Sequence, residues 1–273
     1  MIKGEKTMTK RRYLALIQQS VNKDDISFEE IATDYLYRAH LKQDLKSFIM
    51  HDVEIGLNNA SAAKVAMSKS ATYATLKREK IPAIEHVFIM NSNSRFISGD
   101  SFQLARELFY QWGETVVLKQ DNGSQGNNVY KISDIVELNK QLQSIFSLQA
   151  NASISPYYEA IFEYRIVTLL GEPKLLLAKE RTRSWKHNLI SGALSKDVEP
   201  TKIPQLSEIA SKVAKAMELD FCSIDILETT SGLRVLEVNE QVMLDEYCKN
   251  NENREEKVAQ LYREAFLERF KRI

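Results

Sequence analysis

Two short apolar segments late in the chain each carry a carboxylate near their centre. Residues 221–228 read Phe-Cys-Ser-Ile-Asp-Ile-Leu-Glu, and residues 233–239 read Leu-Arg-Val-Leu-Glu-Val-Asn. Both are rich in apolar and β-branched residues and flank a Thr-Thr-Ser-Gly turn, so they predict a β-hairpin. A carboxylate inside a core strand is costly unless it is paired, hydrogen-bonded or bound to a metal. Asp225 and Glu237 must therefore have partners.

The spacing of these acids predicts how they lie in the hairpin. Successive strand residues point to opposite faces, so Glu237 and Asn239 share one face. A turn centred near Ser231 places Asp225 directly opposite Glu237. Three hard oxygen donors then converge, which suits Mg²⁺. The alternative is that the acids pair with Arg or Lys on a solvent-facing sheet, and the hairpin alone does not decide between the two.

A second candidate feature is a polar, glycine-containing loop at residues 120–127 between two β-branched segments. Lys119 ends the first segment, and a lysine can meet a phosphate as a point charge. Glycines let backbone N–H groups approach phosphate oxygens. The spacing fits neither the GxxxxGK[ST] nor the GxGxxG pattern. A plain hairpin loop is therefore an alternative.

The rest of the chain alternates hairpins with helices. Helical patterns cover residues 58–80, 102–112, 134–150, 203–217 and 255–270; residues 84–90 predict a strand, and residues 162–180 a further hairpin. Short helices are expected in the first fifty-odd residues, where Ser27 and Glu30 match a capping box. Without regular βαβ alternation, the pattern favours an α+β fold with mainly antiparallel sheets. Residues 181–196 are polar and predict a mobile stretch.

Composition excludes several classes of function. Among 273 residues, 37 Lys and Arg balance 37 Asp and Glu, so no net field would gather nucleic acid or an anionic membrane. No apolar run reaches the roughly 18 residues of a membrane span, and residues 13–17 are too short for a signal sequence. Cys222 and Cys248 form no CxxC motif, which argues against a disulfide framework or zinc site. We expect a cytoplasmic protein, with the possibility of a homo-oligomer left open.

In chain order, the segments from about Asn58 to Tyr247 resemble the ATP-grasp superfamily, in particular its ribosomal-protein glutamate ligase (RimK) branch. Residues 223–227 and 235–239, Ser-Ile-Asp-Ile-Leu and Val-Leu-Glu-Val-Asn, are similar to its metal-binding strands. Residues 66–69 ahead of Ile-Pro at 81–82 resemble the helix with its first nucleotide-binding lysine. Residues 116–126 resemble the second lysine and glycine loop. The remaining matches are Ser-Pro-Tyr-Tyr-Glu at 155–159 with the interdomain linker, Glu-Tyr-Arg at 163–165 with a strand opening, and residues 181–192 with an Arg, Asn-Leu and Gly segment.

The resemblance implies roles for individual residues, although each alone also fits a solvated surface charge, a sheet-pairing cation or core-edge packing. The implied roles are metal binding by Asp225, Glu237 and Asn239; ATP binding by Lys69, Lys119, Gly123, Ser124, Gly126, Tyr157, Tyr158 and Glu159; catalysis by Arg165 and Arg181; and substrate binding by Arg183, Asn188 and Gly192.

The implied fold is the ATP-grasp fold, in which two α+β subdomains with antiparallel sheets hold ATP between them. We expect a reduced, mostly helical N-terminal region at 1–57, a central subdomain with the glycine loop at 58–152 and a C-terminal subdomain with the metal strands at 153–273. The superfamily usually carries an N-terminal α/β domain with a parallel sheet, which this sequence does not show. Many members also have small residues after the motif asparagine, where this chain has Glu-Gln-Val-Met-Leu.

The implied activity is that of an ATP- and Mg²⁺-dependent ligase, in which Mn²⁺ can replace Mg²⁺. Such an enzyme activates a carboxylate as an acyl phosphate and joins it to an amine, here on an amino acid or peptide, with no nucleic-acid or membrane partner. The alternatives are a thioester-forming ligase, a kinase, a nucleotide-binding protein without turnover, or an interaction module that binds no nucleotide.

Overall fold

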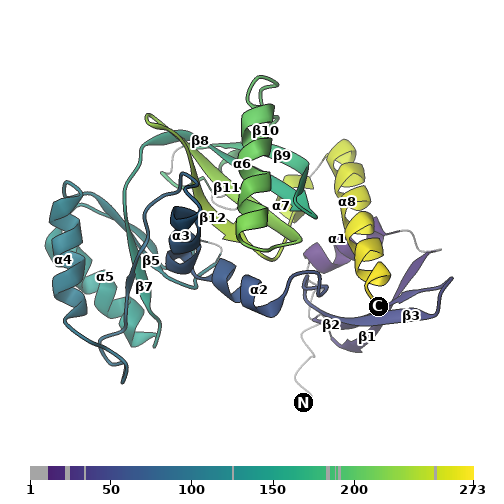
Figure 1. Ribbon diagram of the computed structural model, residues 1–273, viewed down its shortest axis with the longest axis horizontal. Helices are drawn as coiled ribbons and strands as arrows, with labels where there is room; N and C mark the ends of the chain where they lie inside the picture. Colours follow the sequence, from purple (N-terminus) through teal and green to yellow (C-terminus); the bar gives the residue numbers. More distant parts are fainter. Residues whose placement is uncertain are drawn as a thin grey trace, which may run out of the picture. The chain divides into compact units, whose positions relative to one another are not determined.

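The computed structural model describes residues 12–21, 25–33, 35–124, 126–182, 185–187, 189, 192–248 and 251–273. The chain divides into two compact units, which are coloured along the sequence in Figure 1. The first unit comprises Met1–Leu57 with Gln241–Ile273, and the second comprises Asn58–Glu240. Residues 241–273 therefore group with the N-terminal residues, whereas the sequence-based division groups them with residues 153–240.

The first unit contains a three-stranded antiparallel sheet, so the prediction of a mostly helical N-terminal region is wrong. Ser27 and Glu30 lie in the first strand and form no capping box. Local sequence misses this sheet because distant residues cover it: the rings of Phe28 and Phe48 lie 5.6 and 5.7 Å from that of Phe266. The elements are α1 (Arg12–Ser20), β1 (Ile26–Ala32), β2 (Leu36–Leu41), β3 (Lys46–His51), α7 (Asp245–Cys248) and α8 (Glu252–Lys271).

A four-stranded antiparallel sheet in the second unit holds the glycine-containing loop. Its order is β4-β7-β5-β6, with β4 (Val87–Ile89), β5 (Val116–Gln120), β6 (Val129–Ile132) and β7 (Ala152–Pro156). Two helices, α4 (Ser101–Gln111) and α5 (Ile135–Ser147), pack on it and begin where Asp100 and Asp134 cap their first turns. Leu118 and Ile154 contribute to the shared core. Strand β7 was not predicted, because Ala, Ser and Pro dominate its sequence.

The five-stranded antiparallel sheet of the second unit carries the predicted acidic hairpin. Its order is β10-β9-β8-β11-β12, with β8 (Ala160–Leu169), β9 (Glu172–Glu180), β10 (Leu194–Lys196), β11 (Phe221–Thr229) and β12 (Gly232–Asn239). The predicted α+β class with antiparallel sheets is thus confirmed.

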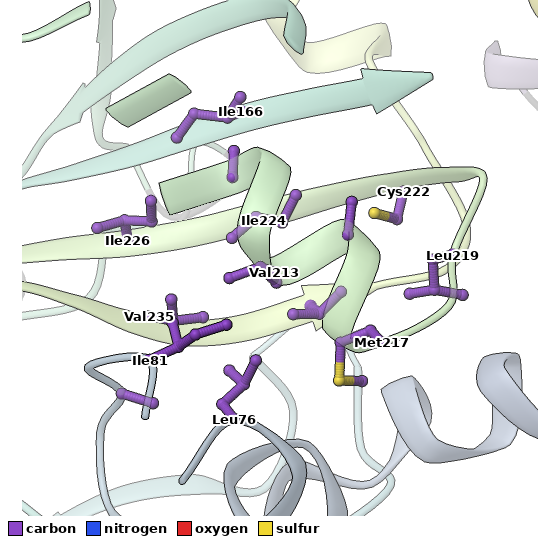
Figure 2. Close-up of a cluster of buried hydrophobic side chains, with 14 of the residues drawn as sticks. Leu76, Ile81, Ile166, Val213, Met217, Leu219, Cys222, Ile224, Ile226 and Val235 are labelled. Carbon is purple, nitrogen blue, oxygen red and sulfur yellow. The ribbon is translucent and has the colours of Figure 1, made fainter. Parts of the chain in front are cut away.

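One face of this sheet is a hydrocarbon core. The helix α6 (Ile203–Ala216) lies across the strands, and α2 (Ala60–Met67) and α3 (Lys69–Arg78) add to the same cluster. Figure 2 shows Val213 of α6 beside Ile224. Val235, Leu76 and Ile81 belong to the same cluster. Burying each such side chain stabilises the fold by about 1.5–3 kcal/mol. With this face filled by apolar groups, the polar side chains of the strands lie on the opposite face.

Within the residues that the structure describes, no helix combines the length and the apolar character that a membrane crossing requires.

Candidate functional site

The predicted register of the acidic hairpin is confirmed, and a β-bulge produces it. Thr229 pairs with Gly232 and Ile226 with Val235, yet Asp225 pairs with Glu237, so Leu236 is the extra residue. A bulge of this kind re-aims the side chains that follow it. Without it, Glu237 would point into the apolar core; with it, both Val235 and Val238 remain in that core while Glu237 and Asn239 turn to the other face.

Neighbouring strands place two cations beside Asp225. The side chain of Arg165 on β8 donates from Nε to Oδ1 at 2.8 Å and from Nη2 to Oδ2 at 2.7 Å. Lys179 on β9 donates to Oδ1 at 3.2 Å and also forms an ion pair with Glu163. The Asp225 side chain is 1% exposed. The alternative in which Asp225 pairs with cations is therefore realised, but on a buried face and not a solvent-facing one.

The electrostatics of this group hold Asp225 and Arg165 in their charged forms. Burial alone would raise the pKa of Asp225, but Arg165 and Lys179 hold it well below its usual range. Burial would likewise lower the pKa of Arg165, and the adjoining carboxylate of Asp225 raises it above its usual value. Such a pair remains ionised at neutral pH, with the planar guanidinium matched to both carboxylate oxygens.

The metal ligands implied by the sequence lie together. Their chemistry fits a cation whose remaining ligands come from a bound phosphate and water. Glu237 and Asn239 are half-buried on the face that holds Asp225. The Nδ2 atom of Asn239 is buried and has no hydrogen-bond partner among the described residues. Over the same residues, no cluster of three or more His, Cys, Asp or Glu side chains is arranged to hold a metal. An oxygen of Asn239, waters and phosphates would have to complete the shell, as Mg²⁺ commonly requires.

Two buried lysines lie near this face. Lys69 is the first residue of α3, and its Nζ donates to the Gly123 carbonyl at 2.7 Å. Lys119 lies in β5, and it is 7% exposed. Burial lowers the pKa of Lys119, with Glu237 opposing the shift and Lys69 adding to it. A buried ammonium group is costly unless it is paired, so Lys119 is a candidate anion-binding group.

The glycines of the loop after Lys119 suit its geometry. A Cβ atom on Gly123 would lie 3.1 Å from Cβ and 3.3 Å from the carbonyl oxygen of Gln120. Gly126 has a φ of +73°, which favours glycine, and its carbonyl accepts a hydrogen bond from Lys186 at 3.2 Å. Ser124 accepts from the backbone N–H of Asn127 through its carbonyl. Gln125 lies outside the described residues.

Strand β7 and the residues after it form a separate polar group. Tyr157 donates from its hydroxyl to Glu159 at 2.9 Å, and Glu159 also pairs with Arg181, which lowers the pKa of Glu159. Lys131 lies 3.6 Å from the centre of the Tyr157 ring. Tyr158 donates to Glu85 at 2.8 Å. The structure thus brings Arg181 together with Glu159 and leaves it without a direct contact to the group around Arg165.

Some candidate residues fall outside these groups. Arg183 and Asn188 lie outside the described residues, and Gly192 accepts a hydrogen bond from Thr182 at 3.0 Å. Sequence reasoning missed two buried residues of the site. Asp121 bonds to both sides of Lys69, and its position two residues after Lys119 was the available signal.

The other missed residue is His86, which is 3% exposed. Burial, with Lys119 and Lys69 nearby, holds its pKa well below 6.5, and the backbone of Leu236 opposes part of that shift. Neither ring nitrogen has a hydrogen-bond partner within the described ranges. No pattern marks this histidine in the sequence, because its neighbours come from three distant segments.

Known proteins are similar to this chain in sequence or in fold. The chain is 29% identical over 130 residues to a probable alpha-L-glutamate ligase of Psychromonas ingrahamii, covering 46% of this chain and 42% of that protein. It is 25% identical over 203 residues to the tetrahydromethanopterin:alpha-L-glutamate ligase of Methanococcus maripaludis, covering 72% and 64%. The chain therefore spans less than two thirds of the length of these curated relatives.

Among solved structures, the fold is similar to the D-alanine–D-alanine ligase of Bacillus anthracis, with a TM-score of 0.61, 16% identity and coverage of 79% of this chain and 72% of that chain. A structure of the same ligase complexed with ATP has a TM-score of 0.60 and 17% identity, covering 79% and 70%. This likeness shows the ATP-grasp fold. The model of the RimK-like ATP-grasp domain matches residues 68–260, more than half of the chain. The chain therefore belongs to the family of RimK-like ATP-grasp domains.

Proposed function

We propose that this chain is an ATP- and Mg²⁺-dependent carboxylate–amine ligase that forms an amide bond through an acyl phosphate. The observation that carries the proposal is the buried charged face of the five-stranded sheet, where Asp225 lies opposite Glu237 and beside Arg165. Glutamate ligases among the relatives and an amide-forming ligase among the structural neighbours support it.

The nucleotide would lie against the two buried lysines. Lys69 and Lys119 offer ammonium groups for its phosphates, and the loop with Gly123, Ser124 and Gly126 offers backbone N–H groups. Tyr157, Tyr158 and Glu159 lie in the segment that the resemblance assigns to the adenine and ribose. Closure of the loop over the phosphates would exclude water from the activated intermediate.

Asp225, Glu237 and Asn239 are the residues that would hold Mg²⁺, or Mn²⁺ in its place. The metal, when bound, supplies neutralisation of phosphate charge. Because Asp225 is already bonded to Arg165 and Lys179, Glu237 is the more available carboxylate of the three residues.

The reaction has two steps. A carboxylate oxygen attacks the γ-phosphorus, the bond to the β-phosphate oxygen breaks, and ADP leaves. An amine nitrogen then attacks the acyl carbon, the bond from that carbon to the phosphate oxygen breaks, and the amine loses a proton. Arg165 and Arg181 would stabilise the phosphate charge in these steps.

The substrate class that we propose is an amino acid or peptide, with L-glutamate as the first amine to test because of the names of the relatives. Arg183, Asn188 and Gly192 are the proposed substrate-binding residues. A carboxylate substrate would need a cation, and the arginines of residues 181–183 lie in the segment that the resemblance assigns to this role.

The proposal is tested by incubating the protein with MgATP, candidate carboxylates and hydroxylamine. An acyl phosphate is trapped as a hydroxamate, with one ADP per product, and replacing hydroxylamine by L-glutamate should give an amide. A thiol acceptor identifies a thioester-forming enzyme, and a phosphorylated product that resists hydroxylamine identifies a kinase. If MgATP binds but no carboxylate gives ADP, the nucleotide-binding alternative is favoured; if MgATP does not bind, the proposal fails.

A further inference from the structure

The buried carboxylate of Asp121 connects the start of α3 to the start of the glycine-containing loop. The residue is 5% exposed. Its Oδ2 accepts a hydrogen bond from the hydroxyl of Ser68 at 2.6 Å, and its Oδ1 accepts from the backbone N–H of Ser70 at 3.0 Å. These contacts lie on either side of Lys69, the residue between the two serines.

The backbone of Asp121 makes the same connection independently. Its carbonyl accepts from the backbone N–H of Lys69 at 3.2 Å, and the Lys69 Nζ lies 3.4 Å from that carbonyl and 2.7 Å from the carbonyl of Gly123. The N–H of Asp121 donates to the carbonyl of Asn151 at 3.0 Å, next to β7. The backbone N–H and the side-chain Nζ of Lys69 are therefore both bonded to the loop, and Asp121 links them to the four-stranded sheet.

The charge of Asp121 suits this position. Ser68 caps α3 by accepting from the N–H of Ala71 at 3.1 Å, which leaves its hydroxyl proton for Asp121. A negative charge at a helix N-terminus is stabilised by the free N–H groups and the helix dipole. Hydrogen bonds to an ionised group are also stronger than those between neutral groups. A neutral residue at position 121 would hold α3 less firmly against the loop.

We infer that Asp121 is a positioning residue of the nucleotide site: it fixes Lys69 and the glycine-containing loop in one arrangement, so that both can contact the same phosphates. The inference rests on the proposed function, because it takes Lys69 and the loop as nucleotide-binding groups. Asp121 itself is no phosphate ligand, since its oxygens are occupied by Ser68 and Ser70 and its charge would repel the nucleotide.

The test compares MgATP binding, measured by calorimetry, in the full chain and in the variants Asp121→Ala and Asp121→Asn. We expect Asp121→Ala to raise the Kd for MgATP and the KM for ATP by about tenfold or more through misplacement of Lys69, with the KM for the carboxylate unchanged. Asp121→Asn should give a smaller increase, because its amide oxygen can still accept from Ser70. Ser68→Ala should weaken binding in the same direction, and combining it with Asp121→Ala should add little.

The matched control is Asp134→Ala. Asp134 caps α5 by accepting from Glu137 N–H at 2.9 Å, so its loss removes a comparable helix cap without touching Lys69. It should lower the melting temperature and leave the Kd for MgATP unchanged. Equal effects of Asp121→Ala and Asp134→Ala on the Kd would overturn the inference. The Lys119→Ala variant distinguishes this failure from failure of the proposed function. If Lys119→Ala weakens MgATP binding and Asp121→Ala does not, the inference fails and the proposed function stands. If the wild type binds no MgATP, both fail.

Discussion

The two faces of the five-stranded sheet are built from the same strands but have opposite chemistry. On one face, Ile224 and Ile226 of β11 pack into a cluster of buried, mainly aliphatic side chains. On the other, Asp225 from between them joins Arg165 and Lys179 in a buried ionic group. Burial of apolar surface stabilises the apolar face, and this stabilisation is non-directional. The stability of the charged face depends on each buried charge having its partner.

This difference separates stability from chemistry along a single strand. A substitution on the apolar face should change how much protein is folded without changing what the folded protein binds. A substitution on the charged face should change binding, and it should also reduce stability wherever it leaves a buried charge alone.

The largest effect is expected for Asp225→Ala. It leaves the charge of Arg165 without its partner and removes one of the two carboxylates that pair with Lys179. The free energy of unfolding should therefore fall by about 3–5 kcal/mol. Denaturant unfolding measures this loss. The paired variant Asp225→Leu with Arg165→Met removes both charges and should recover most of the stability while binding no MgATP. A paired variant as unstable as Asp225→Ala would contradict the ionic account of this face.

The next effect is expected on the apolar face. Ile226→Ala removes a fully buried side chain and should lower the free energy of unfolding by about 2–5 kcal/mol. The Kd for MgATP of the folded fraction should stay unchanged. Ile161→Ala is the control, because that side chain on β8 is 59% exposed and its truncation should cost less than about 0.5 kcal/mol. A large change in the Kd with Ile226→Ala would break the separation of the two faces.

A smaller effect is expected from pH, through His86. Its pKa in the folded chain lies well below 6.5, so the unfolded chain binds a proton first as the pH falls. Stability is therefore fully present above about pH 6.5 and declines below it, by at most about 1.4 kcal/mol per pH unit for one group. The pKa of His187 is also lowered by burial, so it adds to the slope. In unfolding measured from pH 7.5 to 5.5, His86→Gln should reduce the slope; an unchanged slope would contradict the assignment.

The acidic hairpin was predictable because its evidence is local. A turn centred near Ser231 predicts Asp225 opposite Glu237, and the structure has that pairing, although the turn itself joins Thr229 to Gly232. The bulge at Leu236 that creates this pairing was not predicted. Val235 and Val238 lie three residues apart, and the sequence alone does not show that both of them point into the core. Local alternation thus predicts which residues meet, but not how the backbone achieves it.

The parts that sequence missed depend on distant partners. Strand β1 looked helical because Phe28 gains its neighbour Phe266 only in the folded chain. His86 has no sequence signature, and Asp121 is marked only by its position two residues after Lys119; Lys69 lies near both of them only in the folded chain. Conversely, Arg181 was expected with the phosphate-stabilising group, and the structure pairs it with Glu159. Long-range contacts of this kind leave no periodic trace in the sequence.

The most direct test of the account is thermal and denaturant unfolding of the wild type and of Glu237→Gln, with and without MgATP. Glu237 is half-buried and lies on the charged face, so its neutral isostere should fold about as well as the wild type. We predict that MgATP at a hundredfold excess over its Kd stabilises the wild type by about 2.7 kcal/mol and stabilises Glu237→Gln far less, while the exposed control Glu172→Gln behaves as the wild type. Equal stabilisation of the wild type and Glu237→Gln would place the nucleotide and metal elsewhere and contradict the central claim.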